Sequence, residues 1–395
     1  MPRERYMLRT CLLIVLAFAG CHLPVAWRGP VLTTAAAPVA ASPAGAAPAA
    51  APAGTKLSPP QSLRPCCAFG TGLKVAVDTL PVPWFQVDNV VEAGALGTHT
   101  YDNGLGVNDR TGSEHNGLVY TCRGGFIDLA HVRDYADWTV YLAWEIDRHA
   151  ASGGVIVLPP EGGERFLVIQ PLPASRLTRA NRRATVIDLA RYAAFNLSVW
   201  HELASGSGWA SFQMFPETAS TFSPEDLYSN VLGTRIAADI LLDNQADGEA
   251  AFNAAMTERL PAALAQLGAI AKEGTDAVLT GIDGQWWDSS QRLPSERLVL
   301  VRNYAFAPPL RPWLVPWTIV QRWCPRGGAP TRLPLPTRFG GEPMDRFLQL
   351  FVSTDETITI ELPHPESRWL SQRDFPVLVD RVRRLLAEKG LRDHP

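Results

Sequence analysis

The sequence predicts an α+β protein with a central helical bundle, a β-hairpin, and a mixed C-terminal lobe rich in proline and tryptophan. Between residues 126 and 271, apolar residues recur at spacings of three and four over several long stretches, which is typical of amphipathic helices. Two apolar runs, 155–158 and 166–169, flank the turn sequence Pro-Pro-Glu-Gly-Gly, and this arrangement predicts a hairpin. After residue 281 the pattern changes to short apolar runs separated by many prolines. A hydrophobic content of 46% and twelve tryptophans supply ample material for a packed core.

The expected elements follow one another along the chain. An alternating strand at 73–77 precedes a stretch rich in Gly, Asn and Asp, which is typical of loops. Helices are expected at 126–149, at 179–205, from 223 onward, at 250–271 and at 376–389, and further strands at 298–301 and 357–360. The helix that opens at Ser223 has the clearest start. Ser223 is a favourable N-cap, Pro224 suits the first helical position, and Asp226 completes a capping-box pattern.

The first twenty residues have the three parts of an export signal. Three arginines form a basic start, an apolar run covers 12–18, and two small residues precede a cysteine. The apolar run is shorter than the roughly 20 residues that a membrane-spanning helix needs. The sequence Phe18-Ala19-Gly20-Cys21 resembles the lipobox of bacterial lipoproteins, in which the cysteine is acylated and becomes the new N-terminus. Phe18 departs from that pattern, because an aliphatic residue is usual there.

The lipobox resemblance implies that the partner of Cys21 is a lipid bilayer. It places the protein in the cell envelope, facing the periplasm, with the inner leaflet of the outer membrane as the expected location. An Ala/Pro-rich stretch at 21–62 cannot bury a core and is expected to act as a tether. We therefore expect a signal peptide at 1–20, a tether at 21–62, a mainly helical functional domain at 63–275 and a C-terminal lobe at 276–395.

The charge balance excludes one class of partner. The chain carries 36 basic and 39 acidic residues, for a formal net charge of −3. Proteins that bind nucleic acids through phosphate contacts present a basic surface. We therefore expect no nucleic-acid partner.

The remaining cysteines are disulfide candidates if the protein is exported. Cys66, Cys67, Cys122 and Cys324 would meet an oxidising compartment, and their connectivity cannot be deduced from sequence. A bond between the adjacent Cys66 and Cys67 is disfavoured by strain.

Several residues in the predicted helices are suited to holding a metal ion. His131 and Asp134 are three positions apart and share a helix face, while His201-Glu202 interrupts an apolar helical stretch. Asp226 begins the next helix. Two histidines and one carboxylate form an open zinc site that leaves a position for water. One hypothesis is therefore a metal-dependent hydrolase with His131, His201 and a carboxylate from Asp134, Glu202 or Asp226, in which Glu202 is also a candidate catalytic carboxylate.

Two further hypotheses stay open. The sequence Thr-Cys-Arg-Gly-Gly-Phe around Cys122 resembles the stretch in which NlpC/P60 cell-wall peptidases open a helix with their catalytic cysteine. In that reading Cys122 is the nucleophile and His201 or His131 the base. An inserted glycine, and a histidine on a helix where that family has a strand, depart from the pattern. The third hypothesis is an envelope scaffold or binding module, in which the polar residues only cap helices or form hydrogen bonds.

The chain also resembles, over most of its length from Arg64, a family of bacterial lipoproteins known only as a domain of unknown function. The segments that carry this resemblance are 64–70, 120–138, His201-Glu202 and 225–230. The resemblance implies a class of protein and no mechanism.

Overall fold

The computed structural model describes residues 57–61, 63–64, 68–77, 80–103, 114–210 and 217–393. These residues belong to one compact unit that covers Ala49–Pro395. The predicted export signal, Cys21, and the pair Cys66 and Cys67 lie outside the described residues. Seven helices and several small antiparallel sheets confirm the predicted α+β class.

Three helices form the centre of the unit: α2 (Leu129–His149), α3 (Arg182–Gly206) and α4 (Asp226–Leu242). They pack against one another, and α2 is buried over most of its length. The contact between α2 and α4 is especially close, because a Cβ at Gly233 would come within 2.1 Å of the Val132 carbonyl oxygen. A glycine at this position therefore allows two helices to approach backbone to backbone.

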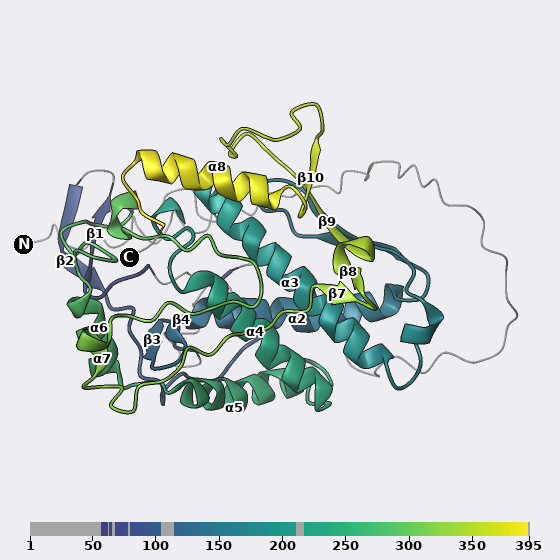
Figure 1. Cartoon of the computed structure of the whole chain (residues 1–395), viewed down its shortest axis with the longest axis horizontal. Helices are drawn as coiled ribbons and strands as arrows, with labels where there is room; N and C mark the ends of the chain where they lie inside the picture. The colour runs from purple at the N-terminus through teal and green to yellow at the C-terminus, as the bar shows by residue number, and fades with distance from the viewer. Residues whose placement is uncertain are drawn as a thin grey trace, which may run out of the picture. The chain divides into compact units, whose positions relative to one another are not determined.

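The outer helices cover this centre from two sides. In Figure 1, α8 (Phe375–Glu388) runs along one side of the unit beside α3, and α5 (Glu249–Leu267) runs along the opposite side beside α4. The turn after α5 has Gly268 in the left-handed conformation, with φ 77°, which ends the helix. The predicted helices at 126–149, 179–205, 250–271 and 376–389 are thus confirmed, with small shifts of their ends.

The largest sheet is antiparallel, with the strand order β10-β9-β6-β5. The predicted hairpin is confirmed by β5 (Gly154–Leu158) and β6 (Arg165–Ile169), in which Ile156 pairs with Leu167. The other two strands, β9 (Leu348–Ser353) and β10 (Trp369–Ser371), come from the C-terminal part of the chain.

The predicted boundary at residue 275 does not divide the structure. Because β9 is hydrogen-bonded to β6, one sheet contains strands from both predicted domains. The side chains of this sheet and of α8 also belong to the same hydrophobic core as the central helices. The C-terminal segment therefore completes the fold and forms no separate lobe.

The expected strand at 357–360 is wrong. Asp355 accepts a hydrogen bond from the backbone N–H of Thr357 (2.9 Å), which turns the chain, and the N–H of Thr359 then donates to the Ser207 carbonyl at the end of α3. At 298–301, Val299 and Val301 form single bridges and no strand. In both places the backbone donors are satisfied outside a sheet.

The remaining elements are short. They are β1 (Leu73–Val77) with β2 (Leu80–Val87), β3 (Leu118–Thr121) with β4 (Gly125–Asp128), β7 (Arg338–Phe339) with β8 (Glu342–Pro343), α6 (Lys272–Gly281), α7 (Trp317–Val320), and the 3₁₀ turns η2 (Ala174–Arg176), η3 (Glu217–Ala219), η4 (Glu296–Leu298) and η5 (Met344–Arg346). Within the part of the chain that the structure describes, no helix has the length and apolar character to cross a bilayer.

Candidate metal centre

Three buried side chains from three helices converge on one point. His131 lies in the first turn of α2, Glu202 near the end of α3, and Asp226 at the start of α4. Each offers one ligand atom, and these atoms all lie within 4.8 Å of one another. The three residues are 4%, 2% and 1% exposed, respectively. Of the five metal-ligating or catalytic positions predicted on these helices, the structure thus brings together three.

In each of the three side chains, one polar atom is fixed by a hydrogen bond. The other polar atom is left as a possible metal ligand at the centre of the cluster. Asn230 Oδ1 lies 2.8 Å from His131 Nδ1, which leaves His131 Nε2 facing Asp226 Oδ1 at 3.9 Å. Glu202 Oε2 accepts from the backbone N–H of Phe222, and Asp226 Oδ2 accepts from that of Ser223, both at 2.7 Å. The opposite carboxylate oxygens, Glu202 Oε1 and Asp226 Oδ1, have no hydrogen-bond partner among the residues that the structure describes. Buried carboxylate oxygens without partners are uncommon, because they lose their hydration without compensation.

The turn that supplies these two backbone donors is itself constrained. Phe222 has φ 51°, a left-handed conformation that bulky side chains rarely adopt, although its side chain is fully buried. The Arg302 guanidinium holds the preceding residues through hydrogen bonds to the carbonyl oxygens of Thr221 (2.6 Å) and Ala219 (3.1 Å). Strained backbone of this kind is common where a fold positions functional groups.

The cluster carries more buried negative charge than positive charge. Burial, and then the charges of Glu202, Glu225 and Asp128, raise the pKa of Asp226 well above its ordinary value. Burial and the Asp128 charge likewise raise the pKa of Glu225, whose Oε1 has no hydrogen-bond partner among the described residues. Arg302 is a nearby cation, and burial lowers its pKa even though these carboxylates attract its charge. An excess of buried carboxylates over cations favours either bound protons or a bound cation.

Comparison with known proteins places the chain in a family. Residues 54–316 match the family described as "Protein of unknown function (DUF4056)". The chain belongs to the DUF4056 family. The matched region includes all three side chains of the cluster. No curated protein and no solved structure matches the chain.

His201, predicted as a metal ligand, has a different partner in this DUF4056 protein. Its Nδ1 lies 2.7 Å from Glu161 Oε1, and its ring centroid lies 6.1 Å from that of His131. Burial lowers the pKa of His201, but the hydrogen bond and charge of Glu161 outweigh that effect and raise the pKa to about 10. The prediction that His201 is a ligand is therefore corrected: its Nδ1 is held by Glu161, and its ring is not among the three side chains whose ligand atoms converge.

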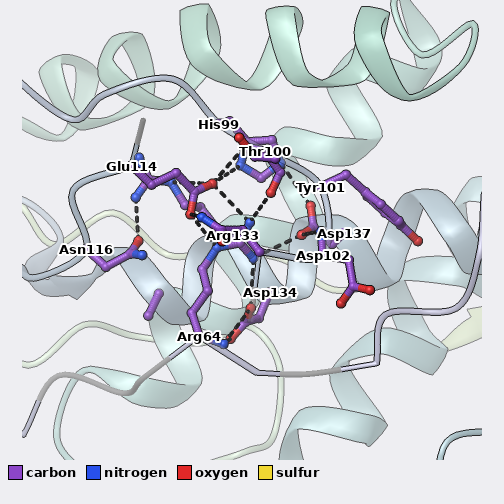
Figure 2. Close-up of polar contacts among 12 residues, drawn as sticks. Arg64, His99, Thr100, Tyr101, Asp102, Glu114, Asn116, Arg133, Asp134 and Asp137 are labelled. Carbon is purple, nitrogen blue, oxygen red and sulfur yellow. Dashed lines mark hydrogen bonds and ion pairs between the residues drawn. The ribbon is translucent and has the colours of Figure 1, made fainter. Parts of the chain in front are cut away.

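Asp134, also predicted as a ligand, belongs to a separate buried network around Arg64. Figure 2 shows Arg64 between three carboxylates, with Nη1 at 2.8 Å from Asp134 and 2.9 Å from Asp137, and Nε at 2.8 Å from Glu114. The His99 Nε2 lies 2.9 Å from the second oxygen of Asp137. Asp134 therefore ties the segment around Arg64 to α2 and is not part of the metal cluster.

Cys122 forms a disulfide with Cys324, with the Cα atoms 5.6 Å apart. Both cysteines are among the four disulfide candidates predicted from the sequence. It also corrects the thiol-hydrolase hypothesis, because a nucleophilic cysteine needs a free thiolate. The disulfide joins the turn between β3 and β4 to the segment after α7.

Glu161 and Arg302 are functional neighbours that sequence reasoning missed. Glu161 lies in the hairpin turn Pro-Pro-Glu-Gly-Gly, where a charged residue is expected to be exposed to solvent. In the structure it is only 4% exposed. Arg302 follows the apolar run 298–301 and is fully buried. The sequence did contain a signal for Arg302, because a charged residue that directly follows an apolar run is a candidate for burial with that run.

Proposed function

We propose that this protein is a lipid-anchored envelope protein that binds a divalent metal ion through His131, Glu202 and Asp226 and uses it in hydrolysis. The observation that carries the proposal is the convergence of three ligand atoms from three helices, where each of the two carboxylates also has one oxygen without a hydrogen-bond partner in the described part of the chain. A divalent cation would offset the excess buried negative charge that otherwise raises the pKa of Asp226.

The ligand types support a transition metal. Imidazole and carboxylate together suit Zn²⁺, Mn²⁺ or Fe²⁺, and His131 has the outer partner typical of metal-bound histidines in Asn230. Ligands bound to zinc at about 2.1 Å in a tetrahedron lie roughly 3.4 Å apart. The 3.9 Å between His131 Nε2 and Asp226 Oδ1 is therefore close to the required spacing.

Three protein ligands leave one coordination position for a water molecule, whose deprotonation a metal promotes. Two buried groups that interact electrostatically with Glu202 have complementary chemistry. Glu225 has an Oε1 with no hydrogen-bond partner among the described residues, which can accept a proton, and a protonated His201 can stabilise a developing negative charge. This combination fits hydrolysis better than binding alone.

Two features support a place in the cell envelope. The basic and apolar start with its lipobox-like end points to acylation of Cys21. The Cys122–Cys324 disulfide is compatible with an oxidising compartment such as the periplasm.

The metal proposal is tested by measuring bound metal. Purified protein, stripped with chelator and dialysed against Zn²⁺, Mn²⁺ or Fe²⁺, is expected to retain one equivalent of ion. Asp226→Asn is expected to retain much less, whereas Asp243→Asn, an exposed position at the opposite end of the same helix, retains the full equivalent. Loaded and stripped protein are then compared on ester, phosphoester and peptidoglycan substrates. Absence of stoichiometric metal from the unaltered protein would refute the proposal.

The anchor is tested separately in cells. Radiolabelled palmitate is expected to label the unaltered protein and Cys11→Ala, in which the substituted cysteine lies inside the signal. Cys21→Ala is expected to show no label. Label retained on Cys21→Ala would refute lipidation at this residue and leave the metal proposal untouched.

A further inference from the structure

A surface on this slightly acidic protein is strongly basic. Residues 297–341 contain seven arginines and no Asp, Glu or Lys, in a chain whose net charge is −3. Four exposed arginines of this stretch, with one from the turn between β3 and β4, form what we call the basic surface: Arg123, Arg311, Arg322, Arg326 and Arg332. Within the described part of the chain, no ion pair joins any of them to a carboxylate. Many exposed arginines elsewhere on the molecule do have such partners, as Arg346 and Arg368 have.

The disulfide brings the two parts of the basic surface together. Arg123 follows Cys122, and the bond to Cys324 places it beside the segment that carries Arg322 and Arg326. The backbone N–H of Thr331 donates to the Arg123 carbonyl at 2.8 Å. Charges that are far apart in sequence are thus held next to one another by a covalent bond.

Arg311 and Arg332 are neighbours through an antiparallel bridge. The backbones of Leu310 and Leu333 exchange two hydrogen bonds of 2.9 Å, which places Arg311 opposite Arg332. Like charges directly opposite each other destabilise a strand pair. This arrangement favours an anionic partner, because such a partner would remove the repulsion.

Tryptophans accompany these arginines. Trp317 in α7 is 48% exposed, and its ring lies about 3.6 Å from the position that a Cβ would occupy at Gly327. The Arg322 guanidinium lies 5.0 Å from the ring centroid of Trp323. Tryptophan concentrates at membrane–water interfaces, and basic residues attract anionic headgroups. In Figure 1, α7 lies beside α6 at the end of the unit away from β9 and β10.

We propose that the basic surface docks the folded unit onto a membrane that contains anionic phospholipids. The choice of a bilayer rests on the proposed lipid anchor, which would keep the unit within reach of the membrane. A tether of Ala and Pro extends by about 3.1 Å per residue, so residues 21–48, which precede the compact unit, would reach about 90 Å. The lipid anchor would then limit the distance between the folded unit and the membrane. The basic surface would set the orientation of the unit, with α7 facing the lipid headgroups.

The experiment uses the chain from His22 onward, which lacks the acylated cysteine and keeps the whole compact unit Ala49–Pro395. Its binding to phosphatidylcholine vesicles, with and without phosphatidylglycerol, is measured by sedimentation. Binding is expected with the anionic vesicles and not with phosphatidylcholine alone. Each arginine contributes about a fivefold increase in affinity, so the double variant Arg322→Ala/Arg326→Ala is expected to bind roughly 25-fold more weakly.

The matched control is Arg346→Ala/Arg368→Ala, which removes the same charge from exposed positions near β9 and β10. It is expected to bind like the unaltered chain, and equal thermal unfolding midpoints show that both variants fold. Trp317→Ala is expected to weaken vesicle binding and to leave binding of soluble polyphosphate unchanged. Equal loss in the control, equal binding to both vesicle types, or polyphosphate binding as tight as vesicle binding would each overturn the proposal. None of these results depends on whether Cys21 is acylated.

Discussion

Replacing Glu202 by glutamine separates a metal ligand from a purely structural carboxylate. Glutamine keeps the shape and an oxygen that accepts the Phe222 N–H, and it removes one negative charge. Two unit charges 4.8 Å apart repel by about 3.5 kcal/mol at an effective dielectric constant of about 20, taking the separation of the ligand atoms as the distance. Without metal, Glu202→Gln is therefore expected to be as stable as the unaltered protein or more stable, by up to about 3 kcal/mol.

Metal is expected to stabilise the unaltered protein more than the variant. An ion present at about 1,000 times its dissociation constant stabilises the unaltered protein by about 4 kcal/mol, and a variant with about 100-fold weaker affinity gains only about 1.4 kcal/mol. For a chain of this size, about 2 °C in the unfolding midpoint corresponds to 1 kcal/mol. The metal is thus expected to raise the midpoint by about 8 °C in the unaltered protein and about 3 °C in Glu202→Gln.

The assay is thermal unfolding in chelator and then in excess Zn²⁺ or Mn²⁺. The control is Asp243→Asn, which removes a charge from an exposed carboxylate and is expected to match the unaltered protein in both conditions. If Glu202→Gln is destabilised in chelator and keeps the full shift with metal, then Glu202 only fixes the Phe222 turn and the reasoning is wrong.

Four further predictions concern the surrounding structure. Arg64→Met leaves three buried carboxylates without their shared cation and is expected to lower the free energy of unfolding by about 3–5 kcal/mol, as measured with denaturant. Arg148→Ala, which breaks a half-exposed ion pair, is expected to cost at most about 1 kcal/mol in the same assay. Cys324→Ser is expected to lower stability by about 2–5 kcal/mol and to produce no gain in hydrolysis; a gain on release of the partner thiol would restore the thiol mechanism. Glu161→Gln is expected to move the pKa of His201 from about 10 back toward its ordinary value, followed by NMR titration of the ring protons. Because that pKa is raised on folding, the stabilisation that the pair provides is full below about pH 6.5 and is lost as the pH rises through about 10. A stability profile of Glu161→Gln that falls over the same pH range as the unaltered protein would contradict this assignment.

Most helices and the hairpin were predictable from the sequence because their signals are local. The spacing of apolar residues and the turn sequence between β5 and β6 depend only on nearby residues. The capping pattern was only partly right. Asp226 accepts the backbone N–H of Ser223 as a capping box requires, but α4 begins at Asp226 with Glu225 as its N-cap, and the Ser223 hydroxyl donates to Glu225. The pattern could not show that the second carboxylate oxygen of Asp226 faces His131.

The partners of the charged residues required the tertiary structure. His131 and Asp134 are three positions apart on α2, yet one faces Glu202 and Asp226 while the other faces Arg64. A difference of about 60° around a helix decides between these environments.

The sequence alone determined the fold class, the ends of most helices and the residue types available for chemistry, because these follow from propensity and periodicity. The tertiary structure alone decided that β9 joins the hairpin sheet, that Cys122 is bonded to Cys324, and that Glu161 is hydrogen-bonded to His201. Each of these contacts joins residues far apart in the chain. The free energy that selects such contacts comes from burial, pairing of charges and loss of water, and none of these is encoded in a local pattern.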